Sequence, residues 1–194
     1  MVEEDVAAPT PRGLTGATAP SEARHTQKPS GPPRSQSIAE VDERNQDVPR
    51  LGCGLAAVDR VLGGGLVAGS LVLLGGDPGI GKSTLLLQVL QGLCRDEAGS
   101  VLYISGEESA AQVALRARRL GATARALRVL AETRLAAILE EAERLQPRVL
   151  AIDSIQTVQV EGVESVPGSL VQVREAALRL LPFAKGRGVA TILV

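Results

Sequence analysis

The sequence predicts an α/β fold in which a mostly parallel β-sheet is flanked by helices. Three observations support this prediction. Short apolar runs alternate with helical segments from residue 51 onward, a glycine-rich loop joins the first buried strand to a helix, and acidic residues follow two later strands. Strands that alternate with helices pair in parallel, so their carboxyl ends share one sheet edge, where ligands bind in such folds.

The individual elements follow from apolar runs and the residues that bound them. Short apolar runs beside turn-forming residues predict strands at 70–74, 100–105, 126–130, 148–153 and 189–194. Apolar residues at helical spacing predict helices at 55–62, 83–95, 110–120, 134–146 and 169–185. Ser109 and Thr133 are expected to cap the helices that follow them, since a hydroxyl there accepts a backbone N–H.

Residues 1–50 differ in composition from the rest of the chain. They contain seven of the eleven prolines, many polar residues and no apolar periodicity. Such a segment buries too little apolar surface to offset the entropy of ordering, so we predict that 1–50 is disordered and that 51–194 forms the core. No stretch resembles a signal peptide or approaches the ~20 apolar residues that span a bilayer. We therefore expect a cytoplasmic protein.

Composition also narrows the classes of function. The predicted core has 15 basic and 14 acidic residues, which gives no nucleic-acid signal, and Tyr103 and Phe183 are its only aromatic residues. The sole histidine, His25, lies in the predicted disordered segment, which excludes Ser/His or Cys/His catalysis. Cys53 and Cys94 have no Cys or His at metal-ligand spacing, so we expect two reduced, buried thiols.

The most informative stretch is a glycine-rich loop. It reads Gly76-Asp77-Pro78-Gly79-Ile80-Gly81-Lys82-Ser83-Thr84 and fits the phosphate-binding pattern G-x-x-x-x-G-K-[ST]. Its glycines let backbone N–H groups converge on phosphate oxygens, and the next helix points its positive dipole end at the same place. We expect Lys82 to reach the β- and γ-phosphates and the Ser83 hydroxyl to bind Mg²⁺. A purely structural turn is the alternative.

Acidic residues are predicted beside these phosphates. Asp153 ends a buried strand, a position from which a carboxylate holds Mg²⁺, although a turn or capping role is the alternative. Glu107 and Glu108 follow another strand, where a carboxylate can orient or deprotonate the attacking water. We expect Glu107 to be the base, supported by Glu108. Alternatively, both acids simply favour the N-terminal end of the following helix.

Arginines on two helices carry weaker signals. Arg116, Arg118 and Arg119 form a basic cluster, which is more typical of a solvated helix face than of a DNA site. Arg174 and Arg179 on the last helix would suit a subunit contact or DNA, and the sequence favours neither.

These motifs together resemble the RadA/Sms family of bacterial DNA-repair proteins, which are RecA-like ATPases. The matching stretches are Asp59–Leu66, Gly75–Thr84, Tyr103–Ser109, Ile152–Thr157 and Pro167–Glu175, and the resemblance runs from about Leu51 to Val194. The resemblance implies a RecA-like P-loop core that binds ATP and Mg²⁺. It also implies that Glu107 is the hydrolytic base and Asp153 the Walker B acid.

The same resemblance implies a hexameric ring that processes branched recombination intermediates on DNA alongside the RecA recombinase. The chain departs from the family pattern, because it lacks the preceding four-cysteine zinc ribbon and has Cys53 where the family more often has Ser or Thr. It also lacks the later sensor position, DNA-binding loop, Lys-Asn-Arg-Phe-Gly motif and Lon-protease-like domain. We therefore expect an incomplete core, truncated on its C-terminal side.

Two other functions fit the same motifs. One is a nucleotide-dependent binding module with negligible turnover. The other is a RecA-like clock or signalling ATPase, which also carries a Glu-Glu pair after the corresponding strand. The amino-acid sequence of the glycine-rich loop favours the repair family.

Overall fold

The computed structural model describes residues 35–39, 41, 48–95 and 99–194. The chain divides into two units, Met1–Arg44 and Asn45–Val194. In the first unit, the Val41 N–H donates a helical hydrogen bond to the Ser37 carbonyl. Most of the segment predicted to be disordered, with His25, lies outside the described residues.

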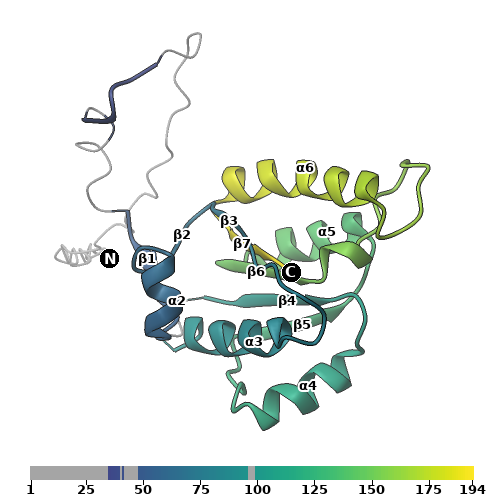
Figure 1. Cartoon of the computed structure of the whole chain (residues 1–194), viewed down its shortest axis with the longest axis horizontal. Helices are drawn as coiled ribbons and strands as arrows, with labels where there is room; N and C mark the ends of the chain where they lie inside the picture. The colour runs from purple at the N-terminus through teal and green to yellow at the C-terminus, as the bar shows by residue number, and fades with distance from the viewer. Residues whose placement is uncertain (1–34, 40, 42–47, 96–98) are drawn as a thin grey trace, which may run out of the picture. The chain divides into compact units, whose positions relative to one another are not determined.

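A parallel β-sheet forms the centre of the second unit (Figure 1). Its five strands are β3 (Leu71–Leu73), β4 (Val101–Ser105), β5 (Leu127–Ala131), β6 (Val149–Asp153) and β7 (Ala190–Leu193). They lie in the order β3-β7-β6-β4-β5, and every pairing is parallel, which confirms the predicted sheet. The strand before the glycine-rich loop is therefore separated from β6 by β7.

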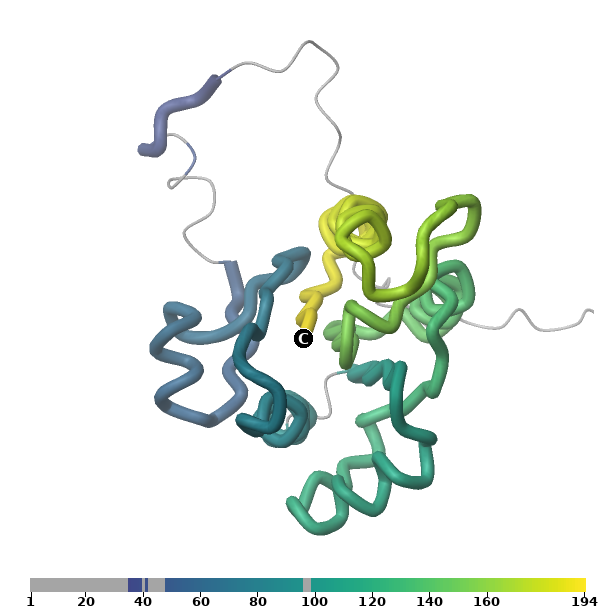
Figure 2. The backbone as a smooth tube through the Cα atoms, turned by 45° about the vertical axis from the view of Figure 1, so that its right-hand side comes forward, coloured from purple at the N-terminus to yellow at the C-terminus, as the bar shows by residue number. Residues whose placement is uncertain are grey.

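Helices cover both faces of the sheet. They are α2 (Ala56–Val61), α3 (Lys82–Leu93), α4 (Ala110–Arg119), α5 (Leu135–Leu145) and α6 (Leu170–Arg187). Val101 and Tyr103 of β4 pack in one apolar cluster with α3 and α4, whereas Leu102 and Ile104 pack in another with α5 and α6. Successive side chains of a strand point to opposite faces, so the fully buried β4 serves both clusters. Figure 2 shows α6 and the α3–α4 pair on opposite sides of the strands.

The hydrophobic pattern predicted the bounds of all five strands of this sheet, and of the five helices named above, to within a few residues. It missed β1 (Arg50–Leu51) and β2 (Leu66–Val67), an antiparallel pair too short to show a period. The predicted cap at Ser109 is confirmed, because its hydroxyl accepts the Gln112 N–H while the Gln112 side chain accepts the Ser109 N–H. Ser109 and Gln112 therefore form a reciprocal capping box at the start of α4.

The predicted cap at Thr133 is wrong. Helix α5 begins at Leu135, with Arg134 at the N-cap position and no capping side chain. The carboxylate of Glu132 instead accepts the N–H groups of Thr133 and Arg134, at 2.8 and 3.0 Å. The Leu135 N–H donates to the carbonyl of Gln159, 2.9 Å away. The carbonyl of Gln159 therefore accepts the Leu135 N–H that a capping Thr133 hydroxyl would have taken, while Glu132 satisfies the two amides before it.

Candidate functional site

The glycine-rich loop leaves β3 and enters α3 with its backbone exposed. Gly79 and Gly81 have φ angles of 79° and 102°, which glycine adopts without a Cβ clash. Gly81 is also the N-cap of α3 and provides no capping side chain. The N–H groups of the first helical turn therefore remain available, and they lie at the positive end of the helix dipole. Such a helix start is suited to binding an anion.

Lys82 folds back over this loop. Its ammonium donates hydrogen bonds to the carbonyls of Gly76 and Asp77, at 2.8 and 3.0 Å. Ser83 follows in the first turn of α3 and is half-buried. The two side chains predicted to serve the phosphates and the metal therefore both lie at the start of α3, beside the backbone of the loop.

The adjacent acids Glu107 and Glu108 have different surroundings. Glu107 is exposed and makes no ion pair among the residues that the structure describes. Glu108 is half-buried, and its Oε1 lies 2.9 Å from Nη1 of Arg116. The Glu108 N–H also donates to the hydroxyl of Ser105 at the end of β4. One acid is therefore open to solvent, and its neighbour is held by the protein.

Asp153, at the end of β6, is held through Tyr103. The Tyr103 hydroxyl donates to Oδ2 of Asp153 at 2.6 Å and accepts Nη2 of Arg116 at 3.0 Å. The same Nη2 lies 4.0 Å from Oδ2 of Asp153. Burial, and then the hydrogen bond to Asp153, raises the pKa of Tyr103 well above its usual range, so the hydroxyl stays a neutral donor.

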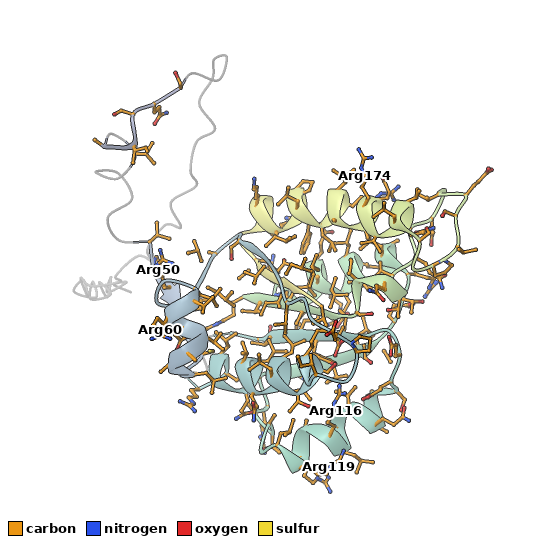
Figure 3. The ribbon with its side chains drawn as sticks, viewed as in Figure 1. Arg50, Arg60, Arg116, Arg119 and Arg174 are labelled. Atoms are coloured by element: carbon orange, nitrogen blue, oxygen red, sulfur yellow. The ribbon has the colours of Figure 1, made fainter. Side chains whose placement is uncertain are left out.

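Sequence reasoning missed the roles of Tyr103 and Arg116. Tyr103 was noted only as an aromatic residue, and the expectation that Arg116 shares a solvated face with Arg118 and Arg119 is wrong. Arg118 and Arg119 are exposed, but the Arg116 side chain is only 20% exposed and lies between α4 and the sheet (Figure 3). Helical periodicity was the available signal, because Arg116 lies beside the buried Ala117 on the apolar side of α4.

The remaining candidates lie outside this group of side chains. Arg174 and Arg179 are exposed on α6, with Arg179 paired to Glu175 at 3.2 Å, and Arg174 points away from the sheet (Figure 3). Cys53 and Cys94 are buried, as predicted, and both are free thiols. None of the described helices has the length and hydrophobicity needed to cross a membrane.

The donor set at the sheet edge fits a triphosphate with Mg²⁺. Backbone amides and the Lys82 ammonium are donors for phosphate oxygens, while the Ser83 hydroxyl and the Asp153 carboxylate are the hard oxygen ligands that Mg²⁺ prefers. Within the described ranges, no cluster of three or more His, Cys, Asp or Glu side chains could hold a metal ion. A Mg²⁺ ion here would accordingly take most of its ligands from phosphate and water, as is usual for this ion.

Comparison with known proteins agrees with this geometry. The AAA domain family matches residues 39–194. The chain is 50% identical over 159 residues to the DNA repair protein RadA of Pseudomonas aeruginosa, covering 82% of this chain and 34% of that protein. It is 46% identical over 182 residues to the DNA repair protein RadA of Escherichia coli, covering 92% of this chain and 39% of that protein. These similarities confirm the resemblance stated from the sequence, and the chain spans less than two fifths of each relative.

Proposed function

Since the chain belongs to the AAA domain family, we propose that it is the ATP-binding and ATP-hydrolysing core of a RadA-like DNA-repair protein. The observation that carries this proposal is the convergence at the carboxyl edge of one parallel sheet. The loop at 76–84 and the exposed Glu107 follow strands that end there, and the half-buried Asp153 is the last residue of β6 at the same edge. Both relatives are named DNA repair proteins, which supports a role in DNA repair for the protein that contains this core.

Binding of the triphosphate would use the loop amides and Lys82. The Lys82 ammonium exchanges the two neutral carbonyls of Gly76 and Asp77 for charged phosphate oxygens, which are stronger acceptors. The amides at the start of α3 donate to the same group without a competing cap. The Lys82 ammonium and these amides support the proposal that the loop binds phosphate.

Hydrolysis would use the acids that follow β4 and β6. Asp153 and Ser83 would hold Mg²⁺, which supplies positive charge for the phosphate oxygens as the bond to the γ-phosphate breaks. Glu107 accepts a proton from the attacking water, because it is exposed and no arginine among the described residues neutralises it. Glu108, which is ion-paired with Arg116, would support Glu107 in this role.

The wider activity is proposed from the resemblance to RadA proteins. We propose that the whole protein assembles as a homo-hexamer and acts on single-stranded or branched DNA together with the RecA recombinase. Hydrolysis would then be coupled to movement of recombination intermediates. These proposals rest on relatives of which this chain covers 34–39%.

A titration with a fluorescent ATP analogue, with and without Mg²⁺, tests the nucleotide site. We expect saturable, Mg²⁺-sensitive binding that Lys82→Ala abolishes and that the exposed control Lys185→Ala leaves unchanged. Glu107→Gln is expected to bind the analogue but to release no phosphate from ATP. A folded wild-type chain that binds no analogue would contradict the proposal. Binding without phosphate release by the wild type would favour the nucleotide-dependent binding module instead.

A further inference from the structure

We infer that Arg116 is a positioning residue, which orients Asp153 through Tyr103 and holds Glu108 directly. The inference rests on the proposed function, because it assigns Arg116 a part in preparing that site for Mg²⁺. The guanidinium contacts Glu108 at 2.9 Å and Tyr103 at 3.0 Å, and Tyr103 in turn contacts Asp153 at 2.6 Å. One side chain from α4 therefore connects acids that follow two different strands.

The position of Arg116 on α4 explains why it reaches these groups. Val113 and Ala117 are buried in the apolar cluster between α4 and the sheet, so the side of the helix that carries them faces the strands. Arg116 lies beside them, whereas Arg119 projects away from the sheet (Figure 3). A cation with a side chain only 20% exposed needs partners, because loss of water from a charge is costly. Glu108 and Tyr103 provide those partners.

The donor character of arginine determines the direction of the hydrogen bonds. A guanidinium donates and never accepts, so the Tyr103 oxygen must accept from Arg116. The single hydroxyl hydrogen of Tyr103 is then directed to Oδ2 of Asp153. Among the described residues, Oδ2 is the only oxygen of Asp153 that accepts a side-chain hydrogen bond, so Oδ1 has no such donor to compete with a metal ion. Arg116 thereby sets the orientation of the carboxylate without touching the metal.

The fork of the guanidinium is needed for this role. Nη1 contacts Glu108 while Nη2 contacts Tyr103, so two nitrogens in a rigid plane serve partners on two segments. A lysine has one compact ammonium on a flexible stem and would favour one partner over the other. Loss of Arg116 also releases Glu108, which would then lie unpaired beside Glu107.

The test measures how Mg²⁺ strengthens binding of a fluorescent ATP analogue. Groups that orient metal ligands typically alter metal affinity by 10- to 100-fold, so we expect Arg116→Ala to raise the Mg²⁺ concentration for half-maximal enhancement by about tenfold. Tyr103→Phe should raise it in the same direction, and Arg116→Lys should give an intermediate value. The exposed Arg119→Ala is the matched control and should leave the Mg²⁺ midpoint unchanged. Affinity for the analogue without Mg²⁺ should stay within about twofold of wild type in all four variants, since the loop amides and Lys82 are intact.

The outcomes separate this inference from the proposed function. Binding by the wild type, together with an unchanged Mg²⁺ midpoint in Arg116→Ala, would overturn the role of Arg116 alone. Equal loss of binding with and without Mg²⁺ in a folded Arg116→Ala would show a merely structural role and also overturn it. If Arg116→Ala does not fold, the midpoints of Arg116→Lys and Tyr103→Phe decide. Absence of binding by the folded wild type would overturn the proposed function itself, and this inference with it.

Discussion

The Tyr103 hydroxyl lies 2.6 Å from Oδ2 of Asp153, across two neighbouring strands of the sheet. Strand β4 pairs with β6 so that Ser105 is opposite Asp153, which places Tyr103 two residues earlier on the same face. Tyr103 is fully buried, so its hydroxyl has no water to replace either partner. One oxygen of the carboxylate at the end of β6 is therefore held by a buried side chain of the core.

Tyr103→Phe is expected to destabilise the fold. The change keeps the ring but leaves Oδ2 of Asp153 and Nη2 of Arg116 without their shared partner. An unsatisfied buried polar group costs about 1–3 kcal/mol, and we expect a loss of that size in the free energy of unfolding. Urea denaturation followed by circular dichroism measures it. An unchanged denaturation midpoint would show that water replaces the hydroxyl.

Gly106→Ala is expected to destabilise the turn after β4. A Cβ at Gly106 would collide with Oγ1 of Thr157 and lie 2.6 Å from Cβ of the same residue, so one of the two segments must move. Overpacking of this kind costs about 1–3 kcal/mol. Thermal unfolding should show a lower Tm for this variant. The control is Gly186→Ala in α6, where an added Cβ would meet no described atom within 4 Å apart from its chain neighbours and nearby helix backbone, and there the Tm should stay constant or rise.

The ion pair between Glu132 and Arg134 predicts a specific pH dependence of stability. The Arg134 guanidinium, followed by the N–H groups of Arg134 and Thr133, lowers the pKa of Glu132 to about 2 from an ordinary 4.5. A lowered folded-state pKa stabilises the protein above the unfolded-state pKa, and that stabilisation is lost as protons bind between about pH 4.5 and 2. Wild type should therefore exceed Glu132→Gln in stability by a constant amount between roughly pH 6 and 8, because Glu132 is ionised there in both the folded and the unfolded state.

Urea midpoints of wild type and Glu132→Gln at several pH values check this dependence. The difference between the two proteins should shrink as the pH falls below about 4.5. The control is Glu164→Gln, because Glu164 is exposed and makes no ion pair within the described part of the chain. A difference that stays the same down to pH 3 would contradict the prediction (about one unit above the folded-state pKa).

Gln172→Ala is expected to loosen the segment before α6. The buried Gln172 amide accepts the Val160 N–H at 2.8 Å and donates to the carbonyls of Val163 and Ser165 at 3.2 and 2.9 Å. Its loss leaves three backbone groups without that partner, so their region should open more often. Hydrogen exchange of the Val160 amide should become faster. The exposed Gln156→Ala is the control, and equal exchange rates in both variants would contradict the role of Gln172.

The chain sequence alone predicted the fold class and the glycine-rich loop because both depend on local pattern. The residues at 76–84 are contiguous, and the periods of strands and helices are read within short windows. The positions of Glu107 and Asp153 at one edge were also predictable, since parallel strands end on the same side. Their catalytic and metal-binding roles, with those of Lys82 and Ser83, remain predictions.

Tertiary structure alone decided which of these side chains meet. The pairing of β4 with β6 and the packing of α4 bring together Tyr103, Arg116 and Asp153, which lie up to 50 residues apart. The same packing gives Glu107 and Glu108 different surroundings, although they are adjacent in the chain. Glu107 is exposed, whereas Glu108 forms an ion pair with Arg116. A hydrogen bond depends on strand register and on the facing of each side chain to within a few tenths of an ångström. Those quantities arise only when distant segments pack, so a local pattern cannot contain them.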